Sequence, residues 1–229
     1  IRVPQRGDSR ALIATAQANA QNTLRAYSAR RSADLTARSQ ALRELQDALG
    51  LAEPPLRIEC IDVSTLQGQD TVASLVVFED GLPRKADYRS FVIRTPAADD
   101  LASVAEVVTR RFARRAPEPE DPAQDDPALT GRRRRFAYPP ALLVIDGGAP
   151  QVRAAQDALM AVGESNLAVV GLAKRLEEVW LPGEEDPVIL PRTSEALYLL
   201  QRVRDEAHRT AIALHRKRRG RRSTTSALD

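Results

Sequence analysis

One apolar run limits what this chain can fold into more than any other feature. Residues 142–148 read Leu-Leu-Val-Ile-Asp-Gly-Gly, so the run stops abruptly at a carboxylate and two glycines. A continuous apolar run with β-branched residues is typical of a strand covered on both faces of an α/β sheet. Asp146 would then stand at the carboxyl end of that strand, where such sheets bind ligands. Because an unpaired buried charge is costly, the sequence predicts a partner for Asp146.

The two glycines that follow Asp146 have a predicted role of their own. Gly147 and Gly148 are expected to let the backbone turn sharply into the next helix and to keep the space above the carboxylate open. Pro150 fits the first turn of that helix, and Gly163 is expected to end it.

The overall composition is that of a globular protein, with 43% hydrophobic and 28% charged residues. The formal net charge of +3 is too small to indicate a nucleic-acid partner by itself. The single cysteine, Cys60, excludes an internal disulfide and predicts a reducing, cytoplasmic location. Because no apolar run is long enough to cross a bilayer, we expect no membrane association. The chain begins with Ile1 rather than Met, which suggests a piece of a longer protein.

The first half of the chain predicts a long helix followed by three strands. Residues 8–49 contain neither proline nor glycine and repeat apolar side chains at helical spacing, so we expect one helix with at most one break, ended by Gly50. Its alanine-rich face is expected to pack on the following domain rather than on a partner. Strands are predicted at 57–63, 71–79 and 85–93, with Asp80-Gly81 as a hairpin turn between the last two. Asp99 or Asp100 can cap a helix over 101–112.

The second half predicts alternating strands and helices after an unusual segment. Residues 116–135 pass from proline and acidic residues to four arginines, which indicates a disordered insertion whose arginines are solvated rather than bound to phosphate. A strand is predicted at 167–173, and a short hairpin at 179–181 and 188–190. The last helix is predicted from a cap at Thr193 or Ser194 to about Leu214, followed by a basic run over 215–222.

This order of elements predicts a fold class and a division of the chain. An antiparallel meander that continues into β-α-β units gives a mixed α/β sheet with helices on both faces, which is the order of the ribonuclease H-like fold. We therefore expect a helical N-terminal extension over 1–53, a ribonuclease H-like domain over 54–215 and a basic tail over 216–229.

Three polar residues are candidates for chemistry: Asp62, Asp146 and His208. If the strands that carry the two aspartates lie side by side, their carboxylates can reach one cation, and they would otherwise repel each other. Oxygen ligands with one imidazole suit Mg²⁺ or Mn²⁺, which could activate water for attack on a phosphoryl group. A second interpretation is that each aspartate forms a cap or turn and that His208 bonds a backbone carbonyl. The residues by themselves leave both interpretations open.

Several longer motifs occur in one order along the chain. They are residues 57–64 (Arg-Ile-Glu-Cys-Ile-Asp-Val-Ser), 71–74 (Thr-Val-Ala-Ser), 77–78 (Val-Phe), 88–89 (Tyr-Arg), 143–148 (Leu-Val-Ile-Asp-Gly-Gly), 171–174 (Gly-Leu-Ala-Lys), 181–183 (Leu-Pro-Gly), 199–209 (Leu-Leu-Gln-Arg-Val-Arg-Asp-Glu-Ala-His-Arg) and 215–219 (His-Arg-Lys-Arg-Arg). From Arg57 onward the chain thus resembles the C-terminal nuclease region of the UvrC family, the incision subunit of bacterial nucleotide excision repair. Residues 1–50 resemble more weakly the helical segment that precedes this region.

The resemblance implies a ribonuclease H-like, metal-dependent endonuclease that cuts damaged DNA on the 5′ side of the lesion. The positions that match the family's catalytic set are Asp62, Asp146 and His208, and Asp100 matches a further carboxylate needed for this incision. The two strand aspartates would hold Mg²⁺ or Mn²⁺. His208 would position or deprotonate water, or protonate the leaving oxygen.

The chain departs from the family pattern at one motif position and in one segment. Thr65 stands where the family often has histidine, and the insertion at 116–135 is longer than usual. The family's N-terminal nuclease domain, which makes the 3′ cut, its UvrB-binding segment and its helix-hairpin-helix modules are expected to lie outside this chain.

The resemblance also implies partners. They are damaged double-stranded DNA and UvrB, in the UvrA/UvrB pathway, and the isolated piece is expected to be monomeric and to bind DNA weakly. Phosphate contacts are expected from Arg204, Arg209, Arg216, Lys217, Arg218 and Arg219. The alternatives are a catalytically inactive ribonuclease H-like domain that binds DNA or protein, and a scaffold whose N-terminal helix docks a partner.

Overall fold

The computed structural model describes residues 8–66, 70–95, 99–113, 139–173 and 178–225. The predicted insertion at 116–135 therefore lies outside the described residues. In chain order the elements are α1 (Asp8–Leu49), β1 (Arg57–Leu66), β2 (Asp70–Glu79), β3 (Leu82–Pro83), η1 (Lys85–Asp87), β4 (Arg89–Val92), α2 (Asp100–Phe112), β5 (Leu142–Ile145), α4 (Ala149–Ala161), β6 (Ala168–Leu172), β7 (Val179–Trp180) and α5 (Glu195–Thr225). Among the described helices, none has the length and apolar character to cross a membrane.

The strands form one mixed sheet in the order β3-β2-β1-β5-β6-β7, with β4 also paired to β2. β1 runs antiparallel to β2 but parallel to β5, and β5 runs parallel to β6. This arrangement confirms the predicted ribonuclease H-like mixed sheet. It also confirms that the strand of Asp62 lies beside the strand that leads to Asp146.

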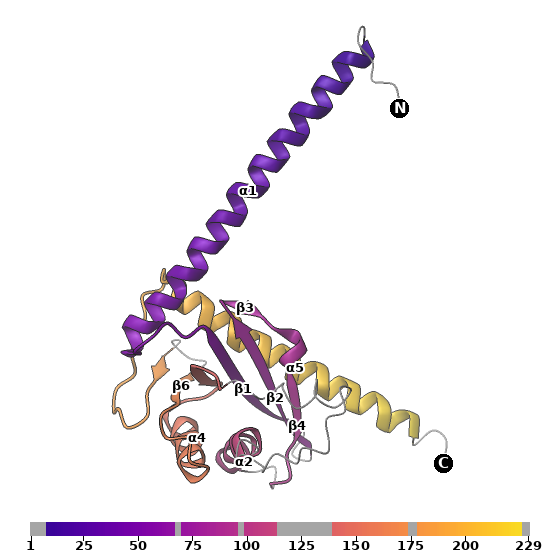
Figure 1. The fold of residues 1–229 in the computed structure, drawn as a ribbon. Coiled ribbons are helices and arrows are strands. Elements are labelled where there is room, and N and C mark those ends of the chain that lie inside the picture. Colours follow the sequence, from indigo (N-terminus) through magenta and orange to yellow (C-terminus); the bar gives the residue numbers. More distant parts are fainter. Residues whose placement is uncertain (1–7, 67–69, 96–98, 114–138, 174–177, 226–229) are drawn as a thin grey trace, which may run out of the picture.

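Helices cover both faces of the sheet, as predicted (Figure 1). α5 and the last turns of α1 pack on one face, whereas α2 and α4 pack on the other. Side chains of β1 alternate between these two cores, so that Ile58 and Cys60 face α5 while Ile61 faces α2 and α4. Asp62, two residues after Cys60, therefore faces α5.

α1 is one continuous helix, and most of its length projects away from the domain (Figure 1). It ends at Gly50, whose φ of +62° permits the amide of Leu51 to donate to the Gln46 carbonyl. The buried contacts come from its last turns, where Ala41, Leu42 and Leu45 join the core. The prediction that its alanine-rich face packs along the domain is thus right only for this end, since Leu12, Leu24 and Leu35 are exposed.

The C-terminal part of α1 caps the N-terminus of α5. The Glu44 carboxylate accepts a hydrogen bond from the backbone amide of Ala196 at 3.0 Å, and Ser194 accepts from the amide of Leu197 at 3.1 Å. The amide of Ala196 is the main reason that the pKa of Glu44 lies below its ordinary value. A carboxylate at a helix N-terminus also interacts favourably with the helix dipole, so this contact fastens α1 to the helix that carries His208.

Three predicted strands differ from the observed ones, and one of them, 188–190, is only an isolated bridge between Val188 and Val179. β1 continues to Leu66, so Asp62 lies inside the strand rather than at its end. The predicted strand 85–93 is interrupted by the 3-10 turn η1, which brings Asp87 to the guanidinium of Arg57 at 3.1 Å. The predicted hairpin turn is confirmed, because Asp80 and Gly81 both have positive φ, as a type I′ turn requires.

Candidate metal centre

Parallel pairing of β1 and β5 places the two aspartates side by side. Ile61 is opposite Ile145 in the register, and the amide of Asp146 donates to the Ile61 carbonyl at 2.9 Å. Asp62 and Asp146 are the next residues on the two strands. The predicted proximity of the two aspartates is therefore confirmed, although Asp62 lies in mid-strand rather than at a strand end.

α5 brings the third side chain to the same place. His208 Nδ1 lies 3.0 Å from Asp62 Oδ2, and one ligand atom from each of Asp62, Asp146 and His208 can be chosen so that all lie within 4.8 Å of one another. The Asp62 side chain is 3% exposed, whereas the His208 side chain is 45% exposed. The cluster is thus buried at Asp62 and exposed at His208, and a substrate could approach from the His208 side.

For two of the three residues, these contacts differ from those of the second interpretation. Asp62 is buried within a strand and forms no helix cap, and His208 bonds a carboxylate rather than a backbone carbonyl. The other histidine, His215, is the one that contacts a backbone carbonyl, that of Ser64 at 3.1 Å.

The cluster creates a strongly charged environment beside a buried thiol. Burial raises the pKa of Cys60 well above its ordinary value, and the negative charges of Asp146 and Asp62 raise it further. The guanidinium of Arg204 acts in the opposite direction. Arg204 lies one turn before His208 on α5, and its guanidinium bonds the Asp205 carboxylate.

The turn after Asp146 depends on space rather than on positive φ. Neither Gly147 nor Gly148 has a positive φ, but a Cβ added at Gly147 would lie 2.8 Å from Gln151 Cγ, so this position has no room for a side chain. A second tight position is Gly171 in β6, where an added Cβ would lie 2.5 Å from Val152 Cγ2 and 2.6 Å from the Gly147 carbonyl oxygen. β6 thus supports the β5–α4 turn by close backbone approach.

Replacement of Gly171 by alanine should therefore destabilise the domain. Overpacking of a filled core costs about 1–3 kcal/mol, and here the clash is with backbone that cannot rotate away. Urea unfolding measures the loss. Gly148→Ala is the matched control, because its Cβ would meet atoms only at 3.9 Å and beyond. Equal stability of the two variants would contradict the close approach.

Asp100 is not brought into the cluster. Asp99 is the cap of α2, since its Oδ1 accepts from the amide of Ala102 at 2.8 Å, and Asp100 is the exposed first residue of that helix. β4 runs in the same direction as β1, so its end leads toward the sheet edge at which β5 reaches Asp146. The functional role of Asp100 remains a prediction.

The arginines expected to contact phosphate lie in different surroundings. The Arg204 side chain is 16% exposed and bonds Asp205, which leaves little of it for DNA. Arg209 is 70% exposed and pairs with Glu206, and Arg216 is exposed two turns further along α5. The helix itself continues through Thr225, but the side chains of Lys217, Arg218 and Arg219 lie outside the described residues.

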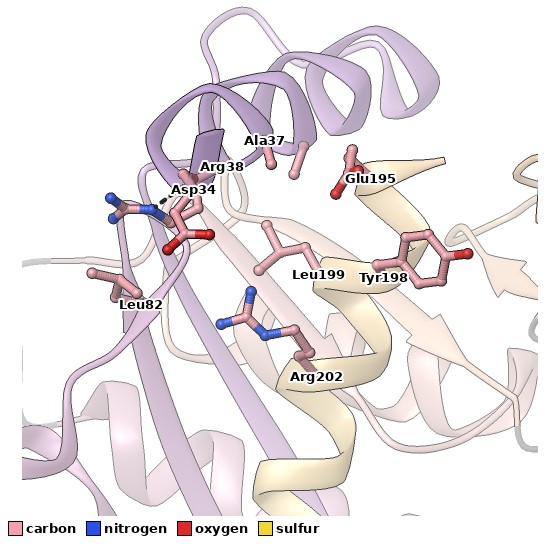
Figure 2. A pocket seen from close by; sticks show the side chains of 9 residues that line it. Asp34, Ala37, Arg38, Leu82, Glu195, Tyr198, Leu199 and Arg202 are labelled. Atoms are coloured by element: carbon pink, nitrogen blue, oxygen red, sulfur yellow. Dashed lines mark hydrogen bonds between the residues drawn. The ribbon is translucent and has the colours of Figure 1, made fainter. Parts of the chain in front are cut away.

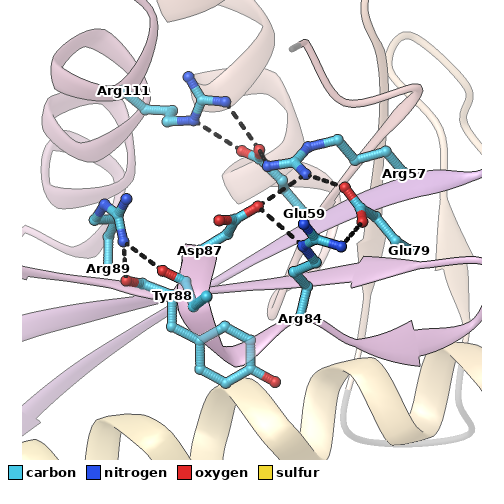
Figure 3. A network of polar contacts seen from close by, with 9 residues as sticks. Arg57, Glu59, Glu79, Arg84, Asp87, Tyr88, Arg89 and Arg111 are labelled. Atoms are coloured by element: carbon cyan, nitrogen blue, oxygen red, sulfur yellow. Dashed lines mark hydrogen bonds and ion pairs between the residues drawn. The ribbon is translucent and has the colours of Figure 1, made fainter. Parts of the chain in front are cut away.

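A buried ion-pair network on the α2 side of β1 was not predicted (Figure 3). Arg111 of α2 donates to both carboxylate oxygens of Glu59, at 2.9 and 2.8 Å, and both side chains are nearly inaccessible. Arg57 joins Glu59 to Glu79 and Asp87. The sequence signal for it was a glutamate between the apolar residues Ile58 and Cys60, since burial of such a charge requires a partner.

One hollow lies away from the cluster, between the C-terminal part of α1, β3 and the start of α5 (Figure 2). Its volume is about 430 Å³, and its lining combines Leu82 and Leu199 with Arg38 and Arg202. Because none of Asp62, Asp146 or His208 lines it, this pocket does not form part of the candidate metal centre.

Comparison with known proteins identifies the family. The model of the UvrC RNAse H endonuclease domain matches residues 46–212. The UvrABC system protein C of Mycobacteroides abscessus is 61% identical over all of this chain, which covers 34% of that protein. The Thermobifida fusca protein of the same name is 59% identical over all of this chain, which covers 36% of it. The chain thus spans about a third of the length of these relatives.

Solved structures of endonuclease V are also similar. Human ENDOV has 14% sequence identity and a TM-score of 0.35, with 77% of this chain and 99% of that chain covered. The Ciona intestinalis endonuclease V in complex with a DNA that contains an inosine has 15% identity and a TM-score of 0.36, with 80% and 68% covered. From the family match and the identity to its relatives, the chain belongs to the UvrC RNase H endonuclease domain family.

Proposed function

We propose that this domain is a divalent-metal-dependent DNA endonuclease and that Asp62, Asp146 and His208 form its active site. The observation that carries the proposal is the convergence of these three side chains, from β1, from the end of β5 and from α5, within 4.8 Å. Chain segments far apart in sequence thus supply two carboxylates and an imidazole to one point at the sheet surface.

The residues present fit a hard divalent cation. Two carboxylates so close together repel each other unless a cation or a proton lies between them. Mg²⁺ and Mn²⁺ favour carboxylate oxygens, and a single imidazole is compatible with Mn²⁺ in particular. Asp62 and Asp146 would hold the ion. When bound, it would stabilise charge on a phosphoryl oxygen and assist ionisation of water.

The proton transfers of the reaction would be carried out by His208. Its Nδ1 faces Asp62, and a carboxylate that accepts a hydrogen bond from one ring nitrogen orients the ring and fixes its tautomer. The opposite nitrogen, Nε2, would then be free to accept a proton from the attacking water or, once protonated, to donate one to the leaving oxygen. The exposed side of the ring suits such an exchange with substrate.

In the cell, we propose that this activity makes the 5′ incision next to a lesion in nucleotide excision repair. The partners would be damaged double-stranded DNA and, through other parts of the protein, UvrB in the UvrA/UvrB pathway. The place of action would be the cytoplasm. The competing proposal, an inactive DNA- or protein-binding domain, would not require three ligand-type side chains to converge.

Magnesium titration of the 229-residue chain tests the site directly. The chain has two histidines, His208 in the cluster and His215 two turns further along α5, so their ring signals in an NMR spectrum can be assigned by substitution. We expect Mg²⁺ to shift the His208 signals, because the ion would bind beside that ring, and to leave those of His215 nearly unchanged. Unmoved His208 signals at millimolar Mg²⁺ would count against the metal site.

A further inference from the structure

On the strand next to Asp62, a buried serine bonds the helix that carries His208. Ser74 of β2 is 0% exposed, and its hydroxyl donates to the backbone carbonyl of Ala207 in α5 at 2.7 Å. Ser74 is also the register partner of Asp62 in the β1–β2 pair. The one hydroxyl therefore joins the strand beside Asp62 to the helix residue that precedes His208.

These contacts connect β1, β2 and α5 in a closed loop of interactions. Asp62 is paired with Ser74 in the β1–β2 register, and the Ser74 hydroxyl bonds the Ala207 carbonyl. The next residue, His208, lies 3.0 Å from the Asp62 carboxylate. Small side chains at Ala207 and Ala211, both fully buried, allow α5 to approach the sheet closely enough for the serine to reach it. The Ser74 hydroxyl is thus one contact that ties the distance between α5 and β2 to the position of His208.

A second contact holds α5 on the other side of His208. His215, two turns further along the helix, lies 3.1 Å from the carbonyl of Ser64, two residues after Asp62. With His215 only 4% exposed, this contact is shielded from water. The helix is thus attached to the sheet at Ala207 and at His215, and His208 lies between them.

We propose that Ser74 is a positioning residue for the metal centre: its hydroxyl sets the distance from α5 to β1 and so holds His208 against Asp62. The functional importance of that distance rests on the proposed function, whereas the geometric role of Ser74 does not. His208 contacts the proposed metal ligand Asp62, and groups that orient metal ligands typically contribute 10–100-fold to metal affinity or activity.

The test compares Ser74→Ala with Thr210→Ala in the 229-residue chain. Thr210 is the matched control, because its hydroxyl also bonds an α5 carbonyl at 2.7 Å, that of Glu206, but lies within the helix and makes no link to the sheet. Calorimetric titration with Mn²⁺ should show affinity about tenfold weaker for Ser74→Ala and nearly unchanged for Thr210→Ala. In the metal-free protein, the His208 NMR signals should shift in Ser74→Ala while those of His215 shift less.

Each outcome bears on one of the two proposals. Unchanged Mn²⁺ affinity together with unmoved His208 signals in folded Ser74→Ala would overturn the positioning role. If the unsubstituted chain does not bind Mn²⁺, the proposed function fails, but the metal-free His208 signals still decide the role of Ser74. Should Ser74→Ala not fold, Ser74→Cys replaces it, because the thiol is of similar size and a weaker donor, and an intermediate loss of affinity is expected.

Discussion

Replacement of Asp146 by asparagine is expected to reduce metal-dependent DNA cleavage by at least about 100-fold. Groups that merely support a metal ligand cost up to about that factor, and Asp146 would be a ligand itself. Asparagine keeps the shape of the side chain but removes the charge that offsets the cation. In the whole incision protein, the 5′ cut should be lost and the 3′ cut retained, as measured on a DNA duplex with a single lesion.

Asp205→Asn is the control for this experiment. Asp205 is a 70% exposed carboxylate on α5 near His208 in sequence, and it lies outside the cluster. The substitution removes the same charge from the same region, so its cleavage rate should stay close to that of the unsubstituted protein. A 5′ cut that survives in Asp146→Asn, or that is lost equally in Asp205→Asn, would refute the assigned role of Asp146.

Replacement of Arg111 by methionine is expected to cost about 3–5 kcal/mol of unfolding free energy. The substitution leaves the Glu59 carboxylate buried without its bidentate partner, and removal of one member of a buried pair is strongly destabilising. Arg57 still reaches Glu59 at 3.4 Å, which offsets only part of the loss. Denaturant unfolding followed by circular dichroism measures the change.

Arg84→Met provides the comparison within the same network. Arg84 is 57% exposed and bonds Glu79 at the surface, where ion pairs contribute about 0–1 kcal/mol. The double variant Glu59→Leu/Arg111→Met should recover most of the lost stability, because it removes both buried charges. If Arg111→Met were no more destabilising than Arg84→Met, the Glu59–Arg111 pair would not be the buried anchor that its geometry indicates.

Local sequence patterns were sufficient for most elements. The apolar run that ends at Asp146, the uninterrupted helix before Gly50 and the Asp80-Gly81 turn all appear where they were predicted. Each depends on neighbours within a few residues, which is why periodicity and turn residues report it. The errors arose where distant contacts intervene, as in η1, where the backbone turns to bring Asp87 to Arg57.

By itself, the sequence determined the fold class, the family and the three candidate residues, because strand and helix patterns and long motifs are local. Only the tertiary structure decided that these residues meet. Asp62 and His208 are 146 positions apart, and their contact depends on the β1–β5 register and on how closely α5 crosses the sheet. Those features come from the packing of whole faces, as does the Glu59–Arg111 pair between β1 and α2, and no short segment encodes them.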